Sequence, residues 1–208
     1  MIIAIDGPAA SGKGTLAKKL ATHFNLACLD TGRLYRALGS TILKDRKDPK
    51  DLKVAVNAVK KVDLKSIQDI ELYTEKVAEY ASIVASFPEV RKELLGFQRE
   101  FANYPPKGKL GAVLDGRDIG SVVCPGADYK FFVTASQEVR ALRRYKQLQE
   151  NGLKGTYASV LADIEQRDER DRTRKVSPLK VVDALVVDTS DKTPNEVFTD
   201  ALSYINTK

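Results

Sequence analysis

The sequence predicts an α/β fold in which a doubly wound sheet of five parallel strands carries a small inserted subdomain and a short lid. Short apolar runs alternate with helical patterns, a glycine-rich turn joins the first run to the first helix, and two charged stretches interrupt the alternation. Apolar runs without intervening polar residues are typical of strands buried on both faces, as in parallel sheets. A chain of 208 residues is long enough for one domain with such an insertion.

The five predicted strands are the short apolar runs at 1–5, 26–29, 111–114, 129–133 and 183–187. Between them, apolar residues three or four positions apart indicate amphipathic helices: Leu16 and Leu20 mark the first helix, and Val90 and Leu94 mark another. The last helix is predicted to begin at the capping box 193–196, where a threonine precedes a glutamate by three residues. This alternation of strands and helices favours a doubly wound sheet.

Two stretches do not fit the alternation. Residues 44–87 begin with a run of charged residues and are mostly helical in pattern, which predicts a small subdomain inserted between the second and third strands. Residues 149–174 combine a glycine hinge at Gly152 with dense charge, which predicts a mobile lid. We therefore expect a single domain over 1–208, with an insertion at 44–87 and a lid region at 149–174.

The turn after the first strand is the most specific motif in the chain. It consists of Gly7, Pro8, Ala9, Ala10, Ser11, Gly12, Lys13, Gly14 and Thr15. A strand, a glycine-rich turn and a helix form the context of a phosphate-binding loop, or P-loop, in which backbone N–H groups and the helix N-terminus surround an anion. Lys13 is expected to reach the β and γ phosphates of a nucleotide, although a purely structural glycine turn is the alternative. The predicted fold is therefore of the P-loop NTPase type.

Gly14 stands where P-loops usually have a serine or threonine that holds Mg²⁺. A glycine has no side-chain ligand to offer. The order Gly-Lys-Gly-Thr is typical of nucleoside monophosphate kinases, which narrows the prediction to small phosphotransferases.

Polar residues follow the second and third predicted strands, at the edge where open α/β sheets bind ligands. Asp115 has the usual place of a carboxylate that organises Mg²⁺. Arg117 can bind a phosphate through two parallel N–H bonds, and Asp118 can accept hydrogen bonds from an exocyclic amine; a solvated Arg–Asp turn is the alternative. Thr31 can cap the helix after the second strand, on which Arg36 faces either solvent or the cleft.

Arginines also recur near the predicted lid. Arg167, Asp171 and Arg174 are spaced for one helical face, and Arg140 and Arg144 are spaced for one face of the preceding helix. A solvated surface with weak ion pairs is the alternative. Their position on both sides of the expected lid of a P-loop protein favours phosphate binding.

Composition excludes several classes of function. The chain has one histidine and two cysteines without a zinc spacing, so we expect neither a histidine base nor a His/Cys metal site. A GTP-driven switch would need an Asn-Lys-x-Asp motif, and no asparagine here precedes a lysine. The net charge of +6 would suit nucleic acid, but the charged runs mix signs and lack interleaved aromatic residues. With no apolar run of transmembrane length and no signal peptide, we expect a cytoplasmic protein.

Taken together, the motifs resemble the bacterial cytidylate kinases. The matching segments, in chain order, are Ile5–Pro8, Gly12–Thr15, Leu29–Arg36, Phe87–Arg91, Asp115–Gly120 and Arg167–Arg172. The resemblance implies phosphorylation of CMP, and usually dCMP, by ATP with Mg²⁺. It further implies a monomer with small-molecule substrates and with no nucleic acid or membrane partner; another small-molecule P-loop kinase is the alternative.

The resemblance also implies roles for single residues. Cytosine contacts would fall on Thr31, Arg91, Asp118 and Arg174. Sugar contacts would fall on Ser82, Arg167 and Asp171. The acceptor phosphate would meet Arg36 and Arg117. The ATP phosphates would be held by the P-loop, above all Lys13, and by Arg140 and Arg144.

Catalysis is expected to need positioning and charge neutralisation rather than a strong base. Lys13, Arg36, Arg117 and Arg144 would neutralise the charge that spreads over the transferred group, and Asp115 would hold Mg²⁺ through water. The chain departs from the family in two places. Thr31 stands where serine is common, and the segment 62–73 leaves little room for the antiparallel insert of many bacterial members.

Overall fold

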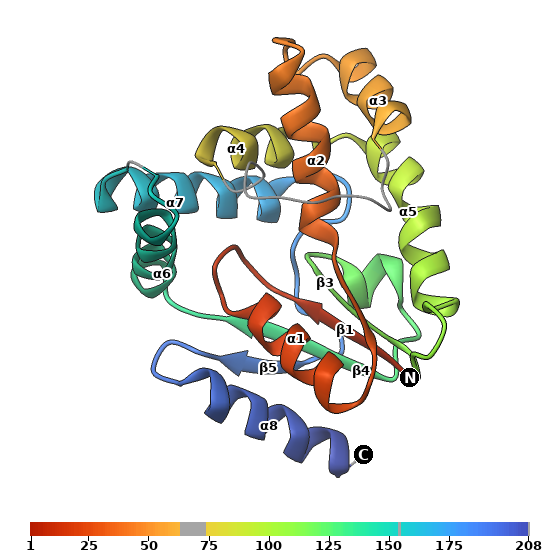
Figure 1. The fold of residues 1–208 in the computed structure, drawn as a ribbon. Coiled ribbons are helices and arrows are strands. Elements are labelled where there is room, and N and C mark those ends of the chain that lie inside the picture. The colour runs from red at the N-terminus through yellow and green to blue at the C-terminus, as the bar shows by residue number, and fades with distance from the viewer. Residues whose placement is uncertain (63–73, 154, 208) are drawn as a thin grey trace.

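A five-stranded parallel sheet lies at the centre of the computed structural model, which describes residues 1–62, 74–153 and 155–207 (Figure 1). The strands are β1 (Ile2–Asp6), β2 (Ala27–Asp30), β3 (Ala112–Gly116), β4 (Tyr129–Thr134) and β5 (Leu185–Asp188). They are ordered β2-β3-β1-β4-β5, and each neighbouring pair is parallel. The prediction of five parallel strands at these places is confirmed.

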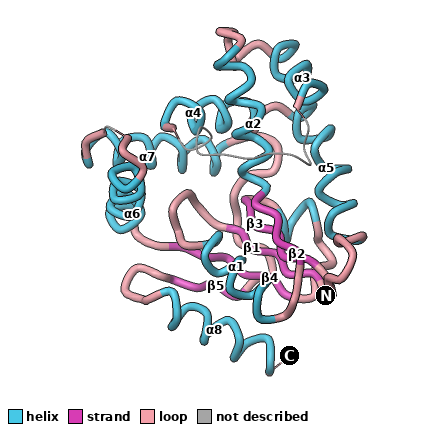
Figure 2. The backbone as a smooth tube through the Cα atoms, in the orientation of Figure 1, coloured by secondary structure: helices cyan, strands magenta, loops and turns pink. Residues whose placement is uncertain are grey.

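Helices cover both faces of the sheet, and Figure 2 shows the strands gathered between them. Apolar residues of α1 (Lys13–His23) and α8 (Pro194–Asn206) pack on one face. Those of α5 (Pro88–Asn103) and of a single π-helical turn, η2 (Ile119–Val123), pack on the other. The capping box predicted at 193–196 is present at the start of α8. The fold is thus doubly wound, as predicted.

Between β2 and β3 the chain forms α2 (Thr31–Lys44), α3 (Leu52–Lys61) and α4 (Glu75–Val84) before it reaches α5. These helices have an apolar core of their own, in which Leu38 and Leu94 are fully buried. Figure 1 shows this group beyond the carboxyl ends of the strands. Residues 63–73, which bear the expected short insert, lie outside the described residues.

Between β4 and β5 lie α6 (Gln137–Glu150) and α7 (Tyr157–Thr173), which pack against each other. Gly152 has a φ of +69° in the turn that follows α6, a conformation that favours glycine. Ala10 of the P-loop packs against the apolar core of this helix pair. Whether the pair moves as a lid stays a prediction.

All five strands run in the same direction, so their carboxyl ends meet at one edge of the sheet. The P-loop follows β1, Thr31 follows β2, Arg117 follows β3, and the start of α6 follows β4. Residues far apart in the sequence therefore meet at this edge, which is where open α/β sheets bind ligands. Among the described residues, no helix combines the length and apolarity needed to cross a bilayer.

Candidate active site

The P-loop follows β1 directly and leads into α1, whose first residue is Lys13. Gly12 has a φ of +93° at the cap of α1, in the region that favours glycine. Gly7 approaches β4 so closely that a Cβ there would lie 1.9 Å from the carbonyl oxygen of Val133. The glycines of the motif are thus needed for the shape of this loop, as the sequence predicts.

Lys13 is buried at the start of α1, and its Nζ donates a hydrogen bond to the carbonyl oxygen of Pro8 at 2.8 Å. Burial and the nearby Arg117 lower the pKa of Lys13 to about 7. A positive charge at this position is therefore unfavourable until an anion neutralises it. An incoming phosphate would supply that anion.

A cavity of about 620 Å³ opens beside the P-loop. Its walls include Ala9–Thr15 and five arginines that come from α2, the end of β3, α6 and α7: Arg36, Arg117, Arg143, Arg144 and Arg167. Arg36, which periodicity left facing either solvent or cleft, thus lies on the cleft. The convergence of five arginines and Lys13 makes the cavity suited to a polyphosphate.

Two carboxylates also line this cavity: Asp115 at the end of β3 and Asp30 at the end of β2. The strand register pairs these two residues. Burial and then the neighbouring Asp30 raise the pKa of Asp115 to about 7. Sequence reasoning singled out Asp115 and missed Asp30, although both acids end adjacent strands. Within the described residues, no group of three or more His, Cys, Asp or Glu side chains is placed to hold a metal ion.

Gly14 lies next to this carboxylate pair. A Cβ at Gly14 would lie 3.3 Å from Oδ2 of Asp115, a tight contact. A serine or threonine at this position would therefore press against Asp115. Glycine at this position, where P-loops usually have serine or threonine, avoids this tight contact.

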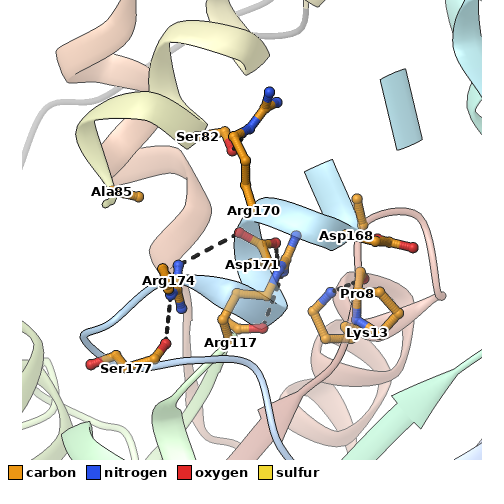
Figure 3. Close-up of polar contacts among 12 residues, drawn as sticks. Pro8, Lys13, Ser82, Ala85, Arg117, Asp168, Arg170, Asp171, Arg174 and Ser177 are labelled. Atoms are coloured by element: carbon orange, nitrogen blue, oxygen red, sulfur yellow. Dashed lines mark hydrogen bonds and ion pairs between the residues drawn. The ribbon is translucent and has the colours of Figure 1, made fainter. Parts of the chain in front are cut away.

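Asp171 of α7 lies among arginines of α7 and of the end of β3 (Figure 3). Arg117 Nε donates to Asp171 Oδ2 at 2.7 Å, and Arg174 Nη1 lies 3.5 Å from Oδ1. Although burial opposes ionisation, Arg117, Arg167 and Arg174 lower the pKa of Asp171 to about 2. The Nε of Arg167 has no hydrogen-bond partner among the described residues. Asp171 is thus held ionised by the arginines around it.

Arg91 of α5 and Asp118 form a second buried pair, with Nη2 2.5 Å from Oδ2. Arg91 also donates to the carbonyl oxygen of Ala85 at 3.1 Å, so both side chains are fixed. Thr31 lies near the end of β3, where its hydroxyl donates to the carbonyl oxygen of Asp115 at 2.8 Å. The expectation that Thr31 caps α2 is wrong: the cap residue is Asp30, and Thr31 contacts the neighbouring strand instead.

A second cavity, of about 500 Å³, lies between α4, α6 and α7. It shares Ala9, Ala10, Arg36, Arg144, Gln147 and Arg167 with the first cavity, so the two spaces meet at these residues. Ser82 is buried on α4, and its Oγ accepts a hydrogen bond from Nε of Arg170 on α7 at 3.1 Å. The sequence reasoning did not single out Arg170.

The structure separates Arg140 from Arg144, which the sequence spacing had placed together. Arg144 lines both cavities, whereas Arg140 lines neither. Arg140 is 3% exposed, and its guanidinium forms a two-point ion pair with Asp168 of α7. Periodicity put both arginines on one face of α6, but it carried no information about the carboxylate of α7 that meets one of them.

Two further residues with clear positions escaped the sequence reasoning. Asp6, at the end of β1, accepts hydrogen bonds from the backbone N–H groups of Ile119 and Gly120 at 2.7 and 2.8 Å. It thereby fixes the chain just after Asp118. Arg143 donates to the hydroxyl of Thr189 at 2.8 Å, and both residues line the first cavity. The position of Asp6 directly before the P-loop could have pointed to it. The sequence held no comparable signal for Arg143.

Comparison with known proteins places these features in a family. A model of the family described as cytidylate kinase matches residues 3–207. A cytidylate kinase of Rhodospirillum rubrum is 52% identical over 206 residues, which cover 99% of this chain and 97% of that protein. One from Paramagnetospirillum magneticum is 52% identical over 208 residues, or 100% and 98%.

A solved structure gives independent support for the fold alone. The crystal structure of an uncharacterized protein from Eubacterium ventriosum superposes with a TM-score of 0.56, covering 100% of this chain and 99% of that one. The two sequences are 15% identical, so this likeness concerns the arrangement of strands and helices.

Proposed function

The chain belongs to the cytidylate kinase family and is an ATP-dependent kinase of CMP, and we propose that it transfers the phosphoryl group in the cleft at the carboxyl edge of the sheet. The observation that carries this proposal is the convergence of Lys13 and five arginines on one cavity beside Asp115. Such a set can neutralise the charge of a transferred phosphoryl group while it holds two phosphates in line.

On the ATP side we assign the phosphates to Gly7–Thr15, with Lys13 on the β and γ phosphates and Arg144 on the transferred group. The low pKa of Lys13 supports this role, because a buried ammonium gains most from a ligand that completes its charge. The loop N–H groups and the N-terminus of α1 add fixed positive charge. Closure of 149–174 over the site as a lid would exclude water.

On the acceptor side we assign Arg36 and Arg117 to the phosphate of CMP, and Ser82, Arg167 and Asp171 to its sugar. Four residues are assigned to the cytosine: Thr31, Arg91, Asp118 and Arg174. The fixed carboxylate of Asp118 supports this choice, because it can accept a hydrogen bond from the exocyclic amine of cytosine. UMP presents a carbonyl group there, which would leave the buried carboxylate facing an acceptor.

Magnesium is the divalent ion we assign to the reaction, with Asp115 and Asp30 as the residues that would hold its water ligands. Oxygen donors suit this ion, which is commonly bound by one or two carboxylates together with substrate phosphates. The pairing of the two acids beside Gly14 fits that donor set. When bound, the ion would neutralise charge on the ATP phosphates.

We also propose that dCMP is an acceptor, that the protein acts as a monomer and that it works in the cytoplasm. We propose dCMP because the sugar is assigned to three side chains, so that its binding does not depend on a single contact with the 2′-hydroxyl group. None of these proposals involves nucleic acid or a membrane as a partner.

Measuring ADP release from Mg-ATP with CMP, dCMP, UMP, AMP or no acceptor tests this function. Fast turnover with CMP and dCMP, and little without an acceptor, is the expected result. Equal rates with all acceptors would refute the assigned cytosine site. Slow hydrolysis that does not depend on an acceptor would refute the phosphoryl transfer to CMP.

A further inference from the structure

Arg140 connects three parts of the molecule. Its Nε donates to the carbonyl oxygen of Ala135 at the end of β4 at 2.9 Å, and its Nη1 donates to the carbonyl oxygen of Ala9 in the P-loop at 3.3 Å. Toward α7, Nη1 and Nη2 donate to Oδ1 and Oδ2 of Asp168 at 3.0 and 2.6 Å. These bonds employ four of the five N–H groups of the guanidinium. Little donor capacity therefore remains for a ligand.

The part of the P-loop that Arg140 contacts needs outside support. Ala10 has a φ of +57°, a left-handed backbone conformation that residues other than glycine rarely adopt. Such a conformation persists only when the surroundings hold it. Here the support comes from the Arg140 bond to Ala9 and from packing of Ala10 against the core of α6 and α7, which includes Val160 and Ile164. Ala9 and Ala10 line both cavities, so their positions shape the site.

The partner of Arg140 lies on the helix that also serves the acceptor side. Figure 3 shows Asp168 and Asp171 leaving α7 in different directions, Asp171 toward Arg117 and Arg174; Asp168 pairs with Arg140. The ion pair with Arg140 therefore fixes α7 relative to the P-loop. Any rotation of α7 about its axis would move Asp171 as well as Asp168.

We propose that Arg140 is a positioning residue, which holds the P-loop to α7 through Asp168, and that it is not a ligand of the ATP phosphates. The proposal deepens the function given above, because it rests on ATP binding at the P-loop. It also replaces the role that the resemblance implied for Arg140. The phosphate contacts from α6 then fall to Arg144, which lines both cavities.

The Asp168→Asn variant separates the two roles, because it removes the charge that pairs with Arg140 and leaves the guanidinium itself in the protein. If Arg140 positions the P-loop, Asp168→Asn and Arg140→Gln should each weaken ATP binding by about tenfold or more, since small displacements at such sites have effects of up to 10²-fold. The double variant should be no weaker than either single one. Glu169→Gln is the matched control, because Glu169 is the next residue of α7 and pairs with Arg172 on the surface.

ATP affinity is measured by titration without an acceptor, and thermal melting verifies that each variant is folded. A merely structural pair would lower the melting temperature and leave the affinity of the folded protein unchanged, which would overturn the proposal. Loss of affinity in Arg140→Gln with none in Asp168→Asn would also overturn it and would make Arg140 a phosphate ligand.

Amide hydrogen exchange of residues 7–12 in the ligand-free protein tests the same contact without ATP. We expect faster exchange in Asp168→Asn and wild-type exchange in Glu169→Gln. Unchanged exchange in Asp168→Asn would refute the positioning role. If residues 7–12 exchange faster in Asp168→Asn, as expected, but the wild-type protein fails to phosphorylate CMP, the proposed function is refuted. The Arg140–Asp168 contact then stays supported.

Discussion

The two halves of the cleft differ in how their charges are balanced. On the P-loop side, burial shifts the pKa values of Lys13 and Asp115 to about 7, so neither charge is fully supported by the protein. On the acceptor side, Asp171 is surrounded by arginines that lower its pKa to about 2, and Asp118 is paired with Arg91. The ATP half thus depends on its ligand for neutralisation, whereas both carboxylates of the acceptor half are paired with arginines before any ligand arrives.

This difference implies that the two halves respond differently to substitution. A residue of the ATP half can be removed without breaking an ion pair on which the fold depends. In the acceptor half, Arg117 and Arg91 each pair with a buried carboxylate, so the loss of either arginine should affect stability as well as activity.

The largest effect is expected for Lys13→Ala. We expect kcat to fall by about 10²–10³-fold or more, because one electrostatic contact in a site closed to water is worth about 3–4 kcal/mol. The melting temperature should not fall, since the buried ammonium bonds only to the carbonyl oxygen of Pro8 among the hydrogen bonds described. Steady-state kinetics and thermal melting measure the two effects. Near-wild-type turnover would contradict the role of Lys13.

Arg117→Ala should lower both activity and stability. Loss of the acceptor phosphate contact should reduce kcat by about 10²-fold. Because Asp171 would lose its closest partner, the free energy of unfolding should also fall, by about 1.5–3 kcal/mol. Urea unfolding followed alongside the kinetics separates these effects. If Arg117→Ala were as stable as Lys13→Ala, the contrast between the halves would be wrong.

Asp118→Asn should change selectivity more than rate. Replacing one carboxylate oxygen with an amide group removes an acceptor for the amine of cytosine. KM for CMP should therefore rise by about tenfold or more, and KM for UMP should change less. The ratio of kcat/KM for CMP over UMP reports the change. An unchanged ratio would exclude Asp118 from the cytosine site.

Asp171 gives the acceptor half a pH dependence with a defined sign. Its pKa in the folded protein, about 2, is below its usual value of 3.8, so its contribution to stability is present above pH 4 and is lost as pH falls toward 2. That contribution is about 2 kcal/mol at neutral pH. The stability difference between wild type and Asp171→Asn should therefore be larger at pH 7 than at pH 2.5 in urea unfolding. A difference that did not depend on pH would contradict this.

The sequence predicted the P-loop side of the cleft better than the acceptor side. The loop and Lys13 are close in sequence, and strand order alone brings Asp115 to them. The pairs Arg117–Asp171 and Arg91–Asp118 join residues 54 and 27 positions apart on separate elements. Spacing could suggest that these residues bind a ligand, but it could not show that they first bind one another. The ion pair of Arg140 was missed for the same reason, because its partner Asp168 lies on another helix.

Proton uptake on ligand binding tests the contrast most directly. Titrations of ATP and of CMP, without metal and at pH 8, are made calorimetrically in buffers of different ionisation enthalpy. At that pH Lys13 is largely neutral, and a phosphate that raises its pKa should draw in close to one proton per ATP. CMP should draw in almost none, because its site is already charged and paired. Equal uptake for both ligands, or none for ATP, would contradict the account.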